Sequence, residues 1–269
     1  RISFSQIVFM GHELIDTHCH LDFPDFDPDL EEVIKHAKEG GVAKMINIGC
    51  DLERAEKSIE IAKKYESIFT SIGLHPQEAG EGDEKFFSQL RELLKEPKIV
   101  AIGECGLEFY GENNSPESRE KQKEIFLKQL DLACEFKKPV IIHCRNAYTE
   151  LLEILRNEKE KNPELCGVIH FFVGHLSHAQ EFLKLGFLIS FTGVITFARD
   201  YDKVIKSVPL EKIMIETDAP FVTPIPFRGE RNEPLYVKYV AEKIAELRGI
   251  SYEEVASQTT ENAEKLFSI

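Results

Sequence analysis

Eight short apolar runs alternate with longer amphipathic stretches along this 269-residue chain. The intervening stretches, such as DPDLEEVIKHAKEGG (27–41) and SPESREKQKEIFLKQLDLACEF (115–136), repeat apolar residues at helical spacing. Strands that alternate with helices form parallel sheets, and strands that are apolar on both faces are covered on both sides. Eight such units predict an α/β fold, a closed (β/α)8 TIM barrel, rather than an open sheet. The expected strands are 14–18, 44–49, 68–74, 98–104, 139–143, 167–171, 187–191 and 212–217.

A single domain is expected, because the chain shows no linker-like tract and no change of composition. Ser115 and Pro116 are typical of a helix start, and Gly249 of a helix stop. Residues 1–9 precede Met10 and are interpreted as an N-terminal extension, so the barrel domain is expected to span 10–269. The N-terminus lacks a long apolar segment, which predicts a cytoplasmic protein that does not engage a membrane.

The net charge of −14 argues against nucleic-acid binding through one broad basic surface. Any contact with nucleic acid must therefore be local. The six cysteines form no CxxC pair, and free thiols in a reducing compartment are expected. No obligate protein partner is evident from the sequence.

The first expected strand ends in LIDTHCHLD (14–22), with a cysteine between two histidines. Residues two apart in a strand point to the same face, so His18 and His20 project together, about 7 Å apart along the chain. Two neutral imidazoles make half of a metal site. Asp16 has the same parity and is expected to orient one of them from behind. Taken alone, a His-X-His pair is as consistent with a chance surface or core feature as with a site.

Other strand ends carry similar groups. Glu104, His143 and His170 lie at the ends of strands four to six, and strand eight runs into Asp218. The carboxyl ends of barrel strands converge on one mouth, where barrel active sites are built. Four imidazoles and two carboxylates are more than one ion usually takes, which favours a binuclear centre. The alternative to a metal centre is that these are buried polar residues that hydrogen-bond to the backbone. That is credible for any one of the six residues but not for all six together.

Alternation also predicts what surrounds these groups. Val100 and Ile102 should share the inward face with Glu104, as Ile141 does with His143. The cysteines that follow three of the proposed ligands should point outward as packing residues between barrel and helices. These cysteines are Cys19, Cys105 and Cys144.

Two further residues on the rim are candidates for substrate contact. His75 lies in GLHP at the end of the third strand, where the alternative is a loop cap. Arg145 lies two residues past His143, and a guanidinium offers a bidentate fork to phosphate oxygens. The alternative for Arg145 is a salt bridge with one of the many carboxylates.

The sequence resembles the TatD-type metal-dependent deoxyribonucleases of the amidohydrolase-like superfamily. The matching segments, in the family's order, are DTHCHLD (16–22), GLHP (73–76), GECGLEFY (103–110), HCR (143–145), HFFVG (170–174), ETDAPF (216–221) and RGERNEP (228–234). The resemblance implies that His18, His20 and Asp218 hold one divalent cation and that His143 and His170 hold another. It further implies that Glu104 bridges the two, and that His75 and Arg145 contact the substrate phosphate. Glu108 departs from the family's usual Asp, which affects the expected contacts of the rim loop.

The implied activity is two-metal hydrolysis of a phosphodiester, with DNA as the expected substrate and Asp218 as general base. The ions expected are Mg, Mn or Zn. One alternative is an amidohydrolase-type enzyme acting on an amide, lactone or phosphotriester. Many such relatives bridge their metals with a carboxylated lysine, and KIVAIGEC offers none at the end of the strand. A second alternative is a non-catalytic, metal-stabilised binding module.

Overall fold

The computed structural model describes residues 13–269, so the extension expected at 1–9 lies outside the described residues. Eight parallel strands pair in chain order into one sheet. They are β1 (Leu14–Cys19), β2 (Val42–Gly49), β3 (Ile68–Ile72), β4 (Ile99–Glu108), β5 (Val140–Arg145), β6 (Gly167–Ile169), β7 (Leu188–Phe191) and β8 (Ile213–Ile215).

The first and last strands meet at their carboxyl ends. Cys19 forms a β-bridge with Ala219, and the backbone N–H of Asp218 donates to the carbonyl of His18 at 2.9 Å. Lower down, the Thr17 hydroxyl donates to the carbonyl of Ile215 at 3.0 Å. These contacts complete the ring, and the predicted single-domain (β/α)8 barrel is confirmed.

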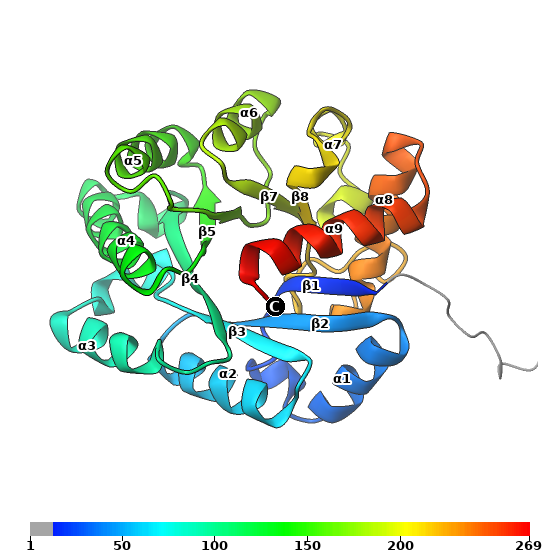
Figure 1. The fold of residues 1–269 in the computed structure, drawn as a ribbon, viewed down its shortest axis with the longest axis horizontal. Helices are drawn as coiled ribbons and strands as arrows, with labels where there is room; N and C mark the ends of the chain where they lie inside the picture. Colours follow the sequence, from blue (N-terminus) through cyan, green and yellow to red (C-terminus); the bar gives the residue numbers. More distant parts are fainter. Residues whose placement is uncertain (1–12) are drawn as a thin grey trace, which may run out of the picture.

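Helices surround the barrel as an outer layer (Figure 1). They are α1 (Leu30–Glu39), α2 (Leu52–Lys64), α3 (Glu84–Leu93), α4 (Pro116–Phe136), α5 (Tyr148–Lys161), α6 (Leu176–Lys184), α7 (Asp202–Ser207), α8 (Val237–Arg248) and α9 (Tyr252–Phe267). The predicted boundaries at α4 and α8 are confirmed: the Ser115 hydroxyl accepts from the N–H of Ser118, and Gly249 ends α8 at φ 66°. Short 3₁₀ helices lie in the connections at Pro24–Phe26, Pro76–Glu81, Gly111–Asn114, Gly193–Thr196, Leu210–Lys212 and Pro234–Tyr236.

The last helix, α9, crosses one end of the barrel instead of joining the outer ring (Figure 1). Its Ala263 and Phe267 pack on the barrel interior, beneath residues such as Ile15 and Ile46. The Asn262 amide donates to the carbonyl of Ile213 at 2.7 Å, at the amino end of β8. The amino-terminal end of the barrel is therefore covered, and the carboxyl-terminal mouth is left for the site.

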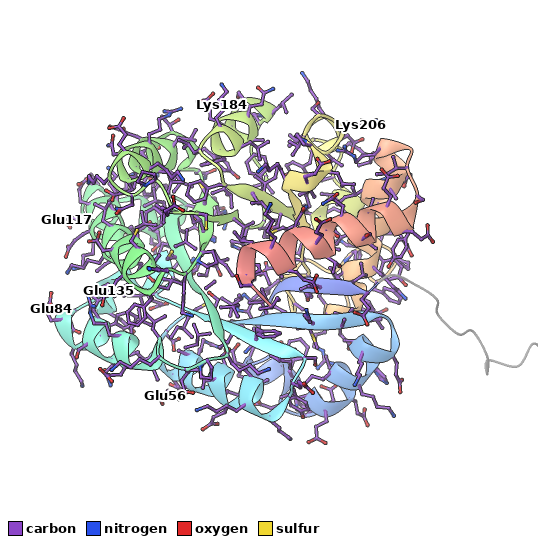
Figure 2. The ribbon with its side chains drawn as sticks, in the orientation of Figure 1. Glu56, Glu84, Glu117, Glu135, Lys184 and Lys206 are labelled. Carbon is purple, nitrogen blue, oxygen red and sulfur yellow. The ribbon has the colours of Figure 1, made fainter. Side chains whose placement is uncertain are left out.

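A larger apolar layer fills the space between barrel and helices. Cys19, Cys105 and Cys144 are buried in it, as predicted for packing residues. Charged side chains stand on the outer faces of the helices, as Glu56, Glu117 and Lys184 do in Figure 2. No helix within residues 13–269 combines the length and the apolar character that crossing a bilayer would require.

Strict alternation fails in two strands, and the prediction for Ile102 is wrong for that reason. Val100 faces the barrel interior, but Ile102 packs in the outer layer, so these two residues do not share a face. The pairing of β4 with β5 shifts register between Ile102 and Cys105. Gly103, inside that shift, has φ 145°, a conformation that side chains disfavour. A similar shift in β1 between Asp16 and Cys19 turns the two histidines toward the mouth.

Candidate functional site

The structure brings all six predicted ligand residues together at the carboxyl-terminal mouth of the barrel. All of them except His18 line a cavity of about 670 Å³. Apart from His143, which is half-buried, each of the six is at most 8% exposed. The residues come from the carboxyl end of β1, from within β4, which continues past Glu104 to Glu108, from near the end of β5 and from the segments after β6 and β8. The six side chains are His18, His20, Glu104, His143, His170 and Asp218.

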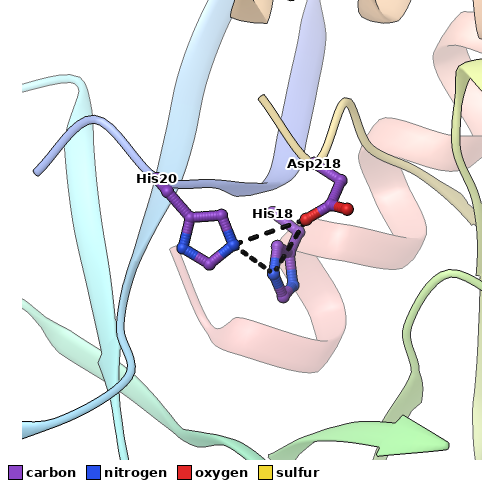
Figure 3. A group of neighbouring side chains, drawn as sticks. All are labelled: His18, His20 and Asp218. Carbon is purple, nitrogen blue, oxygen red and sulfur yellow. Dashed lines mark hydrogen bonds and ion pairs between the residues drawn. The ribbon is translucent and has the colours of Figure 1, made fainter. Parts of the chain in front are cut away.

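The first group joins β1 to the segment after β8 (Figure 3). The Nε2 atoms of His18 and His20 lie 3.3 Å apart. Asp218 Oδ1 lies 3.7 Å from the first and 3.4 Å from the second. Two imidazole nitrogens and one carboxylate oxygen therefore face a common point.

The second group is centred on Glu104, whose two oxygens face different neighbours. Oε2 lies 3.3 Å from His18 Nε2, in the first group. Oε1 lies 2.7 Å from His143 Nδ1 and 2.6 Å from His170 Nε2. The carboxylate therefore lies between two sets of imidazoles, one oxygen toward each.

The donor chemistry of these residues fits divalent cations. Facing nitrogens such as those of His18 and His20 repel each other through their lone pairs unless a proton or a cation lies between them. Groups of three residues offer donor atoms that all lie within 4.8 Å of one another. Three of these groups are His18–His20–Asp218, His18–Glu104–His170 and His75–Glu104–His143. Mixed nitrogen and oxygen donors suit Zn, Mn or related ions.

The electrostatics of the site favour the ligand forms of several groups. Burial alone would raise the pKa of the Glu104 carboxyl, but nearby His170 and His75 and a hydrogen bond from His143 hold that pKa well below its ordinary value. Contacts with His20 and His18 likewise outweigh burial and lower the pKa of Asp218. Burial, together with the charge of His170, lowers the pKa of His18. Both carboxylates are therefore ionised near neutral pH, and His18 is neutral.

Asp16 does not take the position that alternation predicts. Its carboxylate accepts from the Thr217 hydroxyl at 2.5 Å, from the Thr217 N–H at 2.9 Å and from the His18 N–H at 3.3 Å. The buried Nδ1 of His18 has no hydrogen-bond partner within the described residues. The expectation that Asp16 orients an imidazole is thus wrong, because the shift in β1 turns its carboxylate toward β8. It fixes the backbone on both sides of the first group instead.

Glu216, which the sequence analysis did not single out, supports the second group. Its Oε1 accepts from the N–H of Phe171 at 2.6 Å and lies 3.4 Å from His170 Nδ1. Its Oε2 accepts from the Ser190 hydroxyl at 2.6 Å. His170 Nδ1 has no hydrogen-bond partner among residues 13–269, so Glu216 acts on this ring through its charge at 3.4 Å, from the position of a carboxylate behind a metal-binding histidine. The sequence offers one sign of this role, because Glu216 is an acidic residue within the largely apolar run KIMIET.

Glu108 also contacts the site, although it was expected in a rim loop. It is the last residue of β4, and its Oε2 lies 3.0 Å from His143 Nε2. His143 thus presents one nitrogen to Glu104 and the other to Glu108. The replacement of the family's usual Asp therefore changes a contact to a proposed ligand.

The two predicted substrate residues lie on the rim of the same cavity. His75 Nε2 is 3.5 Å from Glu104 Oε1, and its Nδ1 accepts from the N–H of Gln77 at 3.2 Å. The Arg145 side chain is 51% exposed, and its NH1 is 3.9 Å from Glu108 Oε2. Its guanidinium stacks 4.0 Å from the centre of the Tyr110 ring. Arg145 is therefore held beside the cavity with most of its hydrogen-bond donors free for a ligand.

The chain is similar in sequence and in fold to proteins of one family. The sequence model of the family described as TatD related DNase matches residues 15–268. A metal-dependent hydrolase of Bacillus subtilis, YabD, whose own name calls it uncharacterised, is 43% identical over 95% of this chain and 99% of its own. A protein of Klebsiella pneumoniae named 3'-5' ssDNA/RNA exonuclease TatD is 32% identical, covering 95% of this chain and 98% of its own. The crystal structure of YjjV, a TatD homologue of Escherichia coli, superposes with a TM-score of 0.89 at 33% identity, over 95% of this chain and 98% of that one.

Proposed function

We propose, from the premise that this chain belongs to the TatD related DNase family of metal-dependent hydrolases, that it is a nuclease that hydrolyses phosphodiester bonds in DNA. The observation that supports this most directly is the position of Glu104 between two groups of imidazoles. The exonuclease name of the Klebsiella relative supports a nucleic-acid substrate. The choice of DNA as substrate and the binding of two ions are the parts of this statement that we propose.

Two divalent cations would occupy the two groups. His18, His20 and Asp218 would hold one, and His143 and His170 the other. Glu104 would offer one oxygen to each. When bound, such ions supply the positive charge that lowers the pKa of a water molecule and neutralises phosphate oxygens. Mg, Mn and Zn remain the candidates, because their choice depends on availability as well as on donor type.

The protein's own residues would then position and deprotonate the reactants. Asp218 is ionised and lies at the floor of the cavity, where it would accept a proton from the attacking water as general base. His75 and Arg145 line the cavity on the Glu104 side and would hold the phosphate. Burial lowers the pKa of His75, so it would act as a neutral hydrogen-bonding group.

This arrangement accounts for a nuclease with a net charge of −14. The positive charge would come from the ions and from Arg145, directly at the phosphate, and a broad basic surface is not needed. All six cysteines are free thiols, which supports a reducing compartment such as the cytoplasm.

A substrate panel tests the proposal. The protein is stripped with a chelator, reloaded with Mg²⁺, Mn²⁺ or Zn²⁺, and assayed on end-labelled single-stranded DNA, a chromogenic phosphodiester and a dihydropyrimidine. DNA cleavage that disappears on chelation and returns with metal is expected. Asp218→Asn should abolish it, while the outward-facing Glu56→Gln should leave it unchanged. Hydrolysis of the dihydropyrimidine alone would favour an amidase-type enzyme, and metal binding without turnover of any substrate would favour a binding module.

A further inference from the structure

We infer that the exposed ring of Phe221, backed by Phe23 and Arg54, is a stacking site for a nucleobase next to the bond that is cleaved. The inference rests on the proposed nuclease function and extends it, because it assigns a binding site for the base beside the site for the phosphate. All three side chains line the cavity above the candidate ligands.

Phe221 is a large apolar residue placed in water beside a polar centre. It is 49% exposed, three residues after Asp218, and its N–H donates to the carbonyl of Asp218 at 2.8 Å. The Asn232 amide donates to the Phe221 carbonyl at 2.5 Å. The backbone that carries the ring is thus fixed to the same loop that carries a candidate ligand. Ligand cavities are lined largely by apolar and aromatic side chains, and Phe221 lines this cavity together with Phe23.

The rings beneath Phe221 connect it to the metal-binding floor. The Phe221 and Phe23 centroids lie 5.7 Å apart at 83°, an edge-to-face contact. His20 lies 4.8 Å from Phe23 and 6.2 Å from Phe221. Phe23 therefore packs against Phe221, and the Phe221 side of the pair remains about half exposed to the cavity. A base on that side would lie directly beside the first group of ligands.

Arg54 holds this support in place. Its guanidinium carbon lies 3.9 Å from the centre of the Phe23 ring. The guanidinium is itself anchored by Asp22 at 3.4 Å and by Asp51 at 3.3 Å. The aromatic pair is thus ordered before any ligand binds, which reduces the entropy that binding must overcome.

Among the groups of a nucleic acid, a nucleobase suits this aromatic site best. Every base has a π-face, so stacking on an aromatic ring binds single-stranded nucleic acid with little regard to sequence. An unpaired base can reach the ring, whereas a base inside a duplex is already stacked on both faces. The site therefore predicts that single strands, or frayed ends of duplexes, bind best.

Base deletion combined with substitution of Phe221 tests this inference. A fluorescent single-stranded oligonucleotide is prepared with one abasic nucleotide, moved through each position near either end. Affinities are measured by anisotropy with Ca²⁺, under conditions where no product forms. In the wild-type protein, loss of one particular base should weaken binding about 5- to 150-fold, the range expected for one stacked base. In Phe221→Ala, the same deletion should change affinity by less than twofold.

Three comparisons make the result specific. Phe221→Tyr should retain the dependence on the base, because it keeps a π-face. Phe221→Leu keeps the apolar bulk without a π-face and should lose the dependence on the base. Ile225→Ala is the matched control, since Ile225 is 50% exposed in the same loop and is not among the cavity-lining residues. Metal content and thermal unfolding confirm that each variant is folded.

The outcomes distinguish this inference from the nuclease proposal beneath it. A wild-type protein that cleaves DNA but shows no base dependence at any position, or a Phe221→Ala variant that keeps the dependence, would overturn the stacking site alone. A wild-type protein that neither binds nor cleaves any oligonucleotide would overturn both.

Discussion

The side-chain amide of Asn232 donates a 2.8 Å hydrogen bond to the carbonyl oxygen of Thr217, the residue before Asp218. The same amide donates to the Phe221 carbonyl, and Asn232 Oδ1 accepts from the N–H of Glu233 at 2.9 Å. Asn232 is fully buried. One side chain thus fixes both ends of the segment 217–221, which contains a proposed ligand and the proposed stacking residue.

Replacement of Asn232 should therefore damage stability and the site together. Asn232→Ala leaves the buried Thr217 carbonyl and the partly buried Phe221 carbonyl without this donor and should cost about 2–6 kcal/mol of unfolding free energy, at about 1–3 kcal/mol for each unsatisfied group. Binding of the ion at Asp218 should weaken as well. Denaturant unfolding and metal titration check the two effects. A variant with wild-type stability would mean that water replaces the amide.

Glu104→Gln separates bridging from folding. The amide retains the size of the side chain but replaces one anionic oxygen by nitrogen, so one of the two expected metal contacts should be lost. We expect a stoichiometry that falls from two ions toward one and a large fall in kcat. The metal-free variant should unfold close to the wild type only above the pH at which His143 and His170 lose their protons, because below it the variant lacks their charged partner. Native mass spectrometry and steady-state kinetics measure these quantities, and retention of two ions with most of the activity would exclude the bridge.

Glu216→Gln should weaken the binding of only one of the two proposed ions. The carboxylate lies behind His170, and loss of its charge should weaken binding at the second group about 10- to 100-fold. The first group, centred on His18, His20 and Asp218, should keep its affinity. Sequential metal titration resolves the two steps. An equal weakening of both steps would point to a general loss of structure instead.

Arg145→Ala should impair the handling of substrate and leave metal content intact, because Arg145 is proposed to contact phosphate. Loss of a charged hydrogen bond costs about 1.5–3 kcal/mol, roughly ten- to a hundredfold in kcat/KM. The kcat/KM of Arg145→Lys should lie between those of the wild type and Arg145→Ala, since an ammonium cannot form the bidentate contact. An unchanged kcat/KM would leave Arg145 only its contacts with Tyr110 and Glu108.

The metal-free protein should lose stability as the pH rises above neutral. Burial disfavours the charged forms of His143 and His170, but Glu104 outweighs burial and raises the pKa of both. Their stabilising contribution is fully present below the unfolded value of about 6.5 and is lost as the pH rises through the folded values. Metal affinity should rise over the same range, because ions and protons compete for these nitrogens. Melting curves with chelator and metal titrations at several pH values test both trends, and a melting temperature that rises with pH would contradict the first.

The barrel and most of the candidate site could be predicted from local pattern. Each expected strand overlaps an observed one, because a parallel strand covered on both faces leaves a short apolar run in the sequence. The proposed ligands follow from their position, since strand ends converge in any barrel. No such local rule covers Glu216 or Asn232. Glu216 hydrogen-bonds to Phe171, 45 positions away, and Asn232 to Thr217, 15 positions away.

The error at Ile102 has a different origin. Alternation assumes one uniform register along a strand, and the shift next to Gly103 breaks it. The same cause explains Asp16, which lies at the edge of the shift in β1. In both strands the irregularity falls directly before a proposed ligand, and it is there that regular geometry would aim the side chain elsewhere.

The contact between β1 and the segment after β8 determines when the site can form on the nascent chain. Asp218 contacts His18 and His20, which the ribosome makes about 10 to 40 seconds earlier at 5–20 residues per second. Until β8 emerges, the histidine pair lacks its carboxylate, and β1 has no neighbour on that side. A nascent chain therefore cannot complete the proposed metal group of His18, His20 and Asp218 until Asp218 has been synthesised. A product released before Asp218 is added would lack one of the two proposed metal-binding groups.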